Sequence, residues 1–111
     1  MNKIKIKPLS VNLAWKGRRF KTQKYKDYEV MLKVMLPAIK LPEPPYHIII
    51  DFGFSNKGSD IDNPLKPFLD ILQKKYNFND KDIYQLTVNK SIVKKGNEFI
   101  DFEIKERELP K

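Results

Sequence analysis

The first half of the chain alternates hydrophobic and polar residues in patterns that predict one strand, one loop and one helix. Lys3–Lys7 alternates lysine with isoleucine at a period of two, which predicts a short edge strand ended by Pro8. Residues 9–21 have no regular period, and we expect a loop there. From Thr22, a suitable N-cap, apolar residues recur at helical spacing, so we expect a helix that ends before Pro37. We assign its apolar positions to the core: Tyr25, Tyr28, Leu32, Met35 and Leu36.

The second half predicts a strand, a helix and two further strands. Residues 46–52 form the most strand-like run, and the isoleucines at positions 48–50 favour burial on both faces. Residues 65–76 carry one apolar stripe at helical spacing. Residues 94–97 are expected to join the last two strands as the turn of a hairpin. Alternating apolar residues mark these strands: Tyr84, Leu86, Val88 and Ile92, then Ile100, Phe102 and Ile104.

The order β-α-β-α-β-β predicts a single α+β domain over residues 1–111, with a mixed sheet and two helices packed on one face. We expect the charged tail from Lys105 onward to fray. The chain has no cysteine, which excludes disulfides and thiolate chemistry. It also has no apolar run of signal or membrane-spanning length, so we expect a soluble, cytoplasmic protein.

The positive charge is concentrated at one end of the chain. Residues 1–45 hold 11 Lys/Arg and 3 Asp/Glu, whereas residues 46–111 hold 11 of each. Basic residues near Trp15, Phe20 and Tyr25 form a mixture that suits a phosphate backbone with exposed bases, although a solvated basic face is the alternative. The residues we expect to bind DNA are Lys16, Arg18, Arg19, Lys21, Lys57 and Lys66.

A pair of carboxylates stands just before the second predicted helix. Asp60 and Asp62 are separated by one residue, Asn63 is a possible N-cap, and Lys66 follows in the first turn. Carboxylate oxygens are the ligands that Mg²⁺ and Mn²⁺ prefer, and a lysine beside them can meet a phosphate oxygen. Turn and capping chemistry is the alternative interpretation of this stretch.

Four further polar residues bear on this site. A third acid, Asp80, follows the helix, and we expect it beside the first two if the next strand runs back alongside. Asp82 is the alternative third acid. Asp51 ends the predicted strand and is interpreted as a polar strand end. His47, the one histidine, is expected to have a surface or hydrogen-bonded role rather than to bind a metal.

The pattern Asp60-x-Asp62-Asn63-x-x-Lys66, followed by Asn79-Asp80, resembles the RusA-like Holliday junction resolvases, endodeoxyribonucleases often encoded by phages and prophages. The opening Pro8-Leu9-Ser10-Val11-Asn12, with Gly17-Arg18-Arg19 and Thr22, is similar to the start of that family. The resemblance runs from Ile4 to about Ile104. It implies an acidic metal-binding triad of Asp60, Asp62 and Asp80, and an essential lysine at Lys66.

By the same resemblance the protein is expected to be a homodimer that uses Mg²⁺, with Mn²⁺ as a substitute, and no small-molecule cofactor. Its expected activity is hydrolysis of phosphodiesters in four-way DNA junctions by paired symmetric nicks, in recombination and repair, in a bacterial cell or a phage-infected host. The candidate dimer interfaces are the edge strand at residues 4–6 and the first helix. Two alternatives remain: a non-catalytic nucleic-acid-binding module, and a nuclease for other branched DNA.

Overall fold

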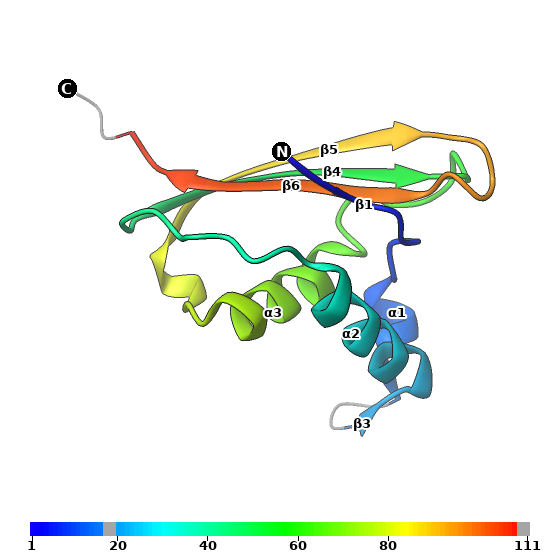
Figure 1. Ribbon diagram of the computed structural model, residues 1–111. Coiled ribbons are helices and arrows are strands. Elements are labelled where there is room, and N and C mark those ends of the chain that lie inside the picture. The colour runs from blue at the N-terminus through cyan, green and yellow to red at the C-terminus, as the bar shows by residue number, and fades with distance from the viewer. Residues whose placement is uncertain (17–19, 109–111) are drawn as a thin grey trace.

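The computed structural model describes residues 1–16 and 20–108, and it confirms the predicted α+β class. A four-stranded mixed sheet is covered on one face by helices, and its other face is left open (Figure 1). Across the sheet the strands are β1 (Asn2–Ile4), β6 (Phe99–Glu106), β4 (Tyr46–Phe54) and β5 (Ile83–Ile92). The helices are α1 (Val11–Ala14), α2 (Gln23–Met35) and α3 (Leu65–Tyr76).

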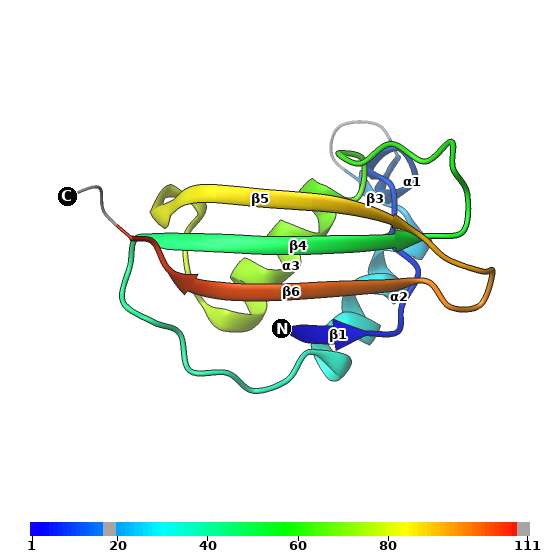
Figure 2. The same cartoon turned by 90° about the horizontal axis from the view of Figure 1, so that it is seen from above.

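The last two strands do not form a hairpin, so that prediction is wrong. β4 pairs with β5 in parallel and with β6 in antiparallel orientation, and it therefore separates them (Figure 2). Because α3 carries the chain back along the sheet, β5 starts at the same end as β4. The segment after β5 then crosses the end of β4, where the Val93 N–H donates to the Phe54 carbonyl at 2.7 Å. Gly96 supplies the turn with a left-handed φ of 97°.

Helix α2 begins as the sequence predicts. The Thr22 hydroxyl oxygen accepts the Tyr25 N–H at 3.1 Å, which is the N-cap geometry, and Tyr25, Tyr28 and Leu32 are buried. The preceding segment is more ordered than the predicted loop. It forms α1 and a two-stranded ribbon of β2 (Trp15–Lys16) and β3 (Phe20–Lys21). The Thr22 hydroxyl also donates to the Leu13 carbonyl at 2.6 Å, which ties this ribbon to α1.

The core lies between the helices and the covered face of the sheet. Phe68 of α3 packs edge-on against Phe52 of β4 and Phe102 of β6, with ring centroids 6.1 and 5.7 Å apart. Ile48 and Ile50 point into this core and are fully buried. Ile49 is only half-buried because it lies on the open face, so the predicted burial of this strand on both faces is wrong there.

The C-terminal end of β6 is held more firmly than predicted. Lys105 pairs with His47, Glu106 pairs with Tyr46, and the Arg107 N–H donates to the Pro45 carbonyl at 2.9 Å. Fraying from Lys105 is therefore wrong for these residues, and the rest of the predicted tail, 109–111, lies outside the described residues. Among the described helices, none has the length and hydrophobicity needed to cross a bilayer.

Candidate metal and nucleic-acid site

The segment from Asp60 to Asn63 connects β4 to α3 and carries the first two predicted acids. Pro64, not Asn63, occupies the cap position of α3, and no side chain caps the helix. The Asn63 amide instead donates to a carboxylate oxygen of Asp60 at 3.2 Å. The predicted N-cap is therefore wrong, and the amide orients the first acid. Asp60 and Asp62 are both exposed and open to a ligand.

One elongated groove runs along α3 and contains three of the four predicted catalytic residues. Its volume is about 200 Å³, and its lining includes Asp62, Lys66, Asp70, Gln73 and Asp80. Asp62 precedes the helix and Asp80 follows it, so its twelve residues, about 18 Å at 1.5 Å each, separate the two ends. The acids are thus aligned along a groove.

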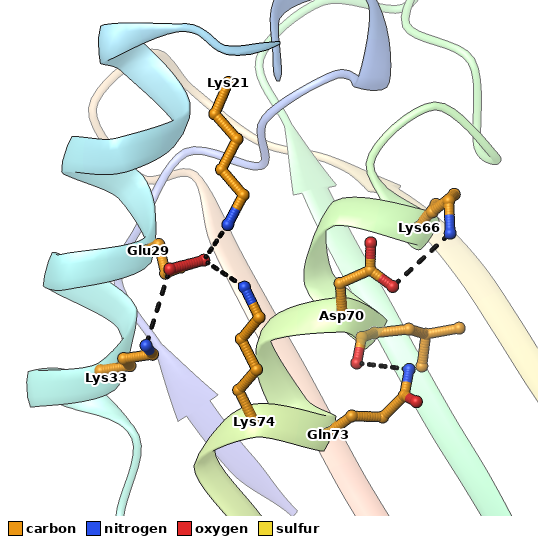
Figure 3. Close-up of polar contacts among 8 residues, drawn as sticks. Lys21, Glu29, Lys33, Lys66, Asp70, Gln73 and Lys74 are labelled. Carbon is orange, nitrogen blue, oxygen red and sulfur yellow. Dashed lines mark hydrogen bonds and ion pairs between the residues drawn. The ribbon is translucent and has the colours of Figure 1, made fainter. Parts of the chain in front are cut away.

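The predicted return of Asp80 to the first acids does not occur in this arrangement. β5 does run alongside β4, in parallel, but it begins at Ile83, which is three residues after Asp80. Asp80 is instead held at the far end of α3, where its N–H donates to the Gln73 side-chain oxygen at 3.0 Å. Gln73 is itself anchored by its amide, which donates to the Leu69 carbonyl at 3.2 Å (Figure 3). Of the two alternative third acids, Asp80 lines the groove and Asp82 does not.

Lys66 lies on the exposed side of α3 with an acidic neighbour. Its ammonium is 3.6 Å from a carboxylate oxygen of Asp70, one turn further along the helix, and its side chain is 71% exposed (Figure 3). An ion pair this exposed contributes little to stability. Lys66 can therefore leave Asp70 for a phosphate at small cost.

Asp60 faces a different depression from Asp62. This cleft of about 230 Å³ lies between the N-terminal segment, the loop after β4 and the turn after β5, and its polar lining includes Lys7, Ser59, Asp60 and Glu98. Backbone and side-chain hydrogen bonds to the Glu98 carboxylate lower its pKa, including one from Ser55 at 2.9 Å. The cleft is therefore lined by the ionised carboxylate of Glu98 as well as by Asp60.

Lys90 of β5 positions the loop that leads to the acids. Its ammonium donates to the carbonyl oxygen of Lys57 at 2.8 Å and also to that of Ser59. Two carbonyls immediately upstream of Asp60 are thus fixed by one side chain from the neighbouring strand. The sequence gives no signal for this role because Lys90 lies more than thirty residues away.

The structure places the predicted DNA-binding residues in different surroundings, and some of them lie outside the described residues. Arg18 and Arg19 lie outside the described residues, as does the side chain of Lys16. Lys57 is exposed in the loop before Asp60, and Lys66 lines the α3 groove. Lys21 is drawn into an ion-pair network, described next.

Three lysines surround Glu29 between β3, α2 and α3, which sequence analysis missed (Figure 3). One carboxylate oxygen lies 3.3 Å from the Lys21 ammonium and 3.1 Å from that of Lys74, and the other lies 3.6 Å from Lys33. Lys33 has the i, i+4 spacing that a helix pattern could have signalled. Lys74 comes from another helix and has no such signal.

Of the two polar residues of β4, His47 behaves as interpreted, whereas Asp51 is not a strand end, because β4 continues to Phe54. His47 is hydrogen-bonded to the Thr87 hydroxyl at 2.8 Å, which confirms the hydrogen-bonded role. Asp51 lies on the open face of the sheet and accepts the Ser91 hydroxyl at 2.9 Å. Neither residue lines the α3 groove.

The donor chemistry of the acids suits a hard divalent cation, but their arrangement defines no single position for it. Within residues 1–16 and 20–108, no three acidic or histidine side chains gather closely enough to hold a metal ion. Asp62 and Asp80 share the α3 groove, and Asp60 faces the neighbouring cleft. The structure therefore aligns the predicted residues without assembling the triad.

Comparison with known proteins gives no family assignment. No protein-family model matches the chain, and a search of curated proteins found no match.

Proposed function

We propose that the protein is a divalent-metal-dependent endodeoxyribonuclease that resolves four-way DNA junctions. The observation that carries the proposal is the α3 groove, whose lining combines Asp62, Lys66 and Asp80. The resemblance to RusA-like resolvases assigns the same residues to the active site. Exposed carboxylates next to an exposed lysine combine oxygen ligands for a cation with a counter-charge for phosphate.

By the resemblance, Asp60, Asp62 and Asp80 would hold Mg²⁺ or Mn²⁺, which would supply Lewis-acid chemistry when bound. Holding one ion would require Asp60, in the neighbouring cleft, to come together with Asp62 and Asp80 of the α3 groove. The remaining roles belong to the chain itself. Lys66 neutralises a phosphate oxygen, and Asn63 and Gln73 position the acids through the hydrogen bonds to Asp60 and Asp80.

We also propose a homodimer, because paired nicks in a four-way junction need two sites related by two-fold symmetry. Ile4 and Ile6 of the edge-strand candidate are buried in the core. The outer face of α2 exposes three apolar side chains, with Val30 64%, Met31 53% and Val34 81% exposed. This outer face of α2, the first helix predicted from the sequence, is the better candidate for self-association.

A non-catalytic nucleic-acid-binding module is the second candidate. The observation that favours it is the separation of Asp60 from Asp80, since structural acids need not meet at one point. Such a module would bind branched DNA in a salt-dependent manner and leave every strand intact.

Incubation with a synthetic four-way junction and Mg²⁺ distinguishes these candidates, with a linear duplex as the control substrate. The resolvase should nick two opposed strands of the junction and leave the duplex uncut. Asp62→Asn should reduce cleavage at least a hundredfold, on the order of the loss of one electrostatic contact in the transition state. Asp27→Asn, at an exposed acid of α2, is the matched control and should cleave normally.

Two results would reject the assignment. Junction binding without cleavage, in Mg²⁺ or Mn²⁺, would leave the binding module. Equal cleavage by the wild type and by the Asp60, Asp62 and Asp80 variants would remove the acids from the mechanism. Efficient cutting of flaps in preference to four-way junctions would keep the nuclease and change its substrate.

A further inference from the structure

The lysine cluster around Glu29 carries more positive charge than its one acid neutralises. Lys21, Lys33 and Lys74 all lie within 3.6 Å of the Glu29 carboxylate. Within the described part of the chain, Glu29 is the one acidic partner of these three side chains. The lysine side chains are 29%, 44% and 45% exposed, so the excess charge faces solvent.

The Glu29 carboxylate organises this cluster. Its side chain is only 16% exposed, and burial alone would raise its pKa. Hydrogen bonds from Lys74 and Lys21 outweigh burial and hold the pKa of Glu29 below its ordinary value. The carboxylate is therefore ionised at neutral pH, and it holds the Lys21 and Lys74 ammoniums at one of its oxygens.

Bringing two ammoniums to one oxygen has an electrostatic cost. The Lys21 and Lys74 ammoniums lie 3.3 and 3.1 Å from the same Glu29 oxygen, so their like charges repel each other at short range. The Lys21 ammonium also lies over the Tyr25 ring, 5.1 Å from its centre, and this cation–π contact helps to hold the ammonium in place. A second anion between the two ammoniums would relieve their repulsion, and a phosphate has the oxygens to accept from both.

The cluster adjoins the proposed active site. Lys21, Tyr25 and Lys74 line a depression of about 250 Å³, whose other lining residues are Asp70 and Gln73. Asp70 and Gln73 also line the groove that contains Asp62 and Lys66. The two depressions are therefore contiguous along α3. Lys74 lies eight residues beyond Lys66, about 12 Å along the helix, so one strand beside α3 can reach both ammoniums with different phosphates.

We propose that Lys21 and Lys74, held in position by Glu29, form a binding site for a backbone phosphate of a DNA strand that runs along α3. This inference rests on the proposed function, because it places the phosphate a few nucleotides from the one beside Lys66. Lysine binds phosphate as a point charge, and ammoniums already held together lose little side-chain freedom on binding. The site would fix the register of the strand without reading its sequence.

The test measures binding of a fluorescent four-way junction in EDTA, so that it does not depend on cleavage. At 0.1 M salt, Lys74→Met should weaken binding about eightfold and lower the log–log salt slope by about 0.9, the effect of one lost phosphate contact. Lys21→Met should have the same effect. Lys74→Arg, which keeps the charge, should bind within about twofold of the wild type.

Lys40→Met is the matched control, because it removes one exposed charge from the connector before β4. It should leave the slope unchanged. Equal losses in the control and cluster variants, or no loss in either cluster variant, would overturn the phosphate site. Thermal melting of each variant separates a binding defect from unfolding, and Lys21→Met tests the site from a second element if Lys74→Met is unstable.

Cleavage in Mg²⁺ distinguishes this inference from the proposed function. If binding depends on Lys21 and Lys74 but the wild type never cleaves, the phosphate site is supported and the nuclease is rejected. Normal cleavage with no effect of either cluster variant on binding would support the nuclease and reject the site. If the wild type prefers polyglutamate to DNA, the phosphate site is rejected in favour of a site for an acidic polypeptide.

Discussion

Gly53→Ala should destabilise the protein through one steric contact at the end of β4. A Cβ atom built on Gly53 would lie 2.3 Å from two carbon atoms of the Phe99 ring. Ordinary contact begins near 3.4 Å, so the ring would have to move by about 1 Å. Phe99 is only 7% exposed, and the Lys3 ammonium lies 4.3 Å from its ring centre, so the ring has little room. The φ angle of Gly53 is not left-handed, which leaves the ring as the cause of strain.

Overpacking of this kind costs about 1–3 kcal/mol, which corresponds to a Tm lower by roughly 5–15 °C for a domain of this size. Thermal melting followed by circular dichroism measures the shift. A double-mutant cycle with Phe99→Leu tests the mechanism, because a smaller side chain accommodates the added methyl group. The double variant should be less destabilised than the sum of the single variants by at least about 1 kcal/mol.

Additive effects in that cycle would refute the steric explanation. Gly96→Ala is a useful comparison, since no atom of the described residues lies within 4 Å of its Cβ position and its φ is left-handed. Phe99→Leu should not relieve the Gly96 variant. If Phe99→Leu rescued both the Gly53 and the Gly96 variant, Phe99 would destabilise the sheet generally and not through contact with residue 53.

Four further predictions address the site and the assembly. Asp80→Asn should abolish junction cleavage and Asp82→Asn should weaken it only mildly; a gel assay showing the reverse would make Asp82 the third acid. Removing the charges of Arg18 and Arg19 together should lower the salt slope of DNA binding by about 0.9 per lost contact, and an unchanged slope would remove this segment from the interface. Glu29→Gln should cost about 1 kcal/mol at pH 7. Because the pKa of Glu29 is lowered in the folded state, this difference should be complete above pH 4.5 and disappear as the pH falls below it, which urea unfolding at several pH values would measure. Sedimentation at micromolar concentration should give a dimer, and a persistent monomer that nicks one strand would exclude paired resolution.

Much of the fold could be predicted because its signals are local. The α3 boundaries at Leu65 and Tyr76 follow from one apolar stripe, and the Thr22 cap follows from a hydroxyl before a helical repeat. Strand pairing is a different matter. Alternation places Ile100 and Phe102 on one face of a strand, but it does not say which neighbour the strand takes. β6 therefore pairs with β4 and β1 although the sequence favoured a hairpin with β5.

The candidate site was predicted in residue type and only partly in position. Asp62 and Lys66 lie close in sequence, so a helix start brings them to one groove. The place of Asp80 depends on the length of α3 and on where β5 begins, which are properties of the whole sheet. The Glu29–Lys74 pair and the Lys90 contacts join segments more than thirty residues apart, and a single sequence contains no pattern for them.

The position of β6 between β1 and β4 determines when this chain can fold during synthesis. Asn2 pairs with Phe102, so β1 has no partner until residues 100–102 have been made. A nascent chain that stops before Phe99 would expose one edge of β4 and the core face of α3 together, both of which favour aggregation. Folding on the ribosome is therefore delayed until β6 emerges, and closure of so long a loop makes the sheet a late and slow step.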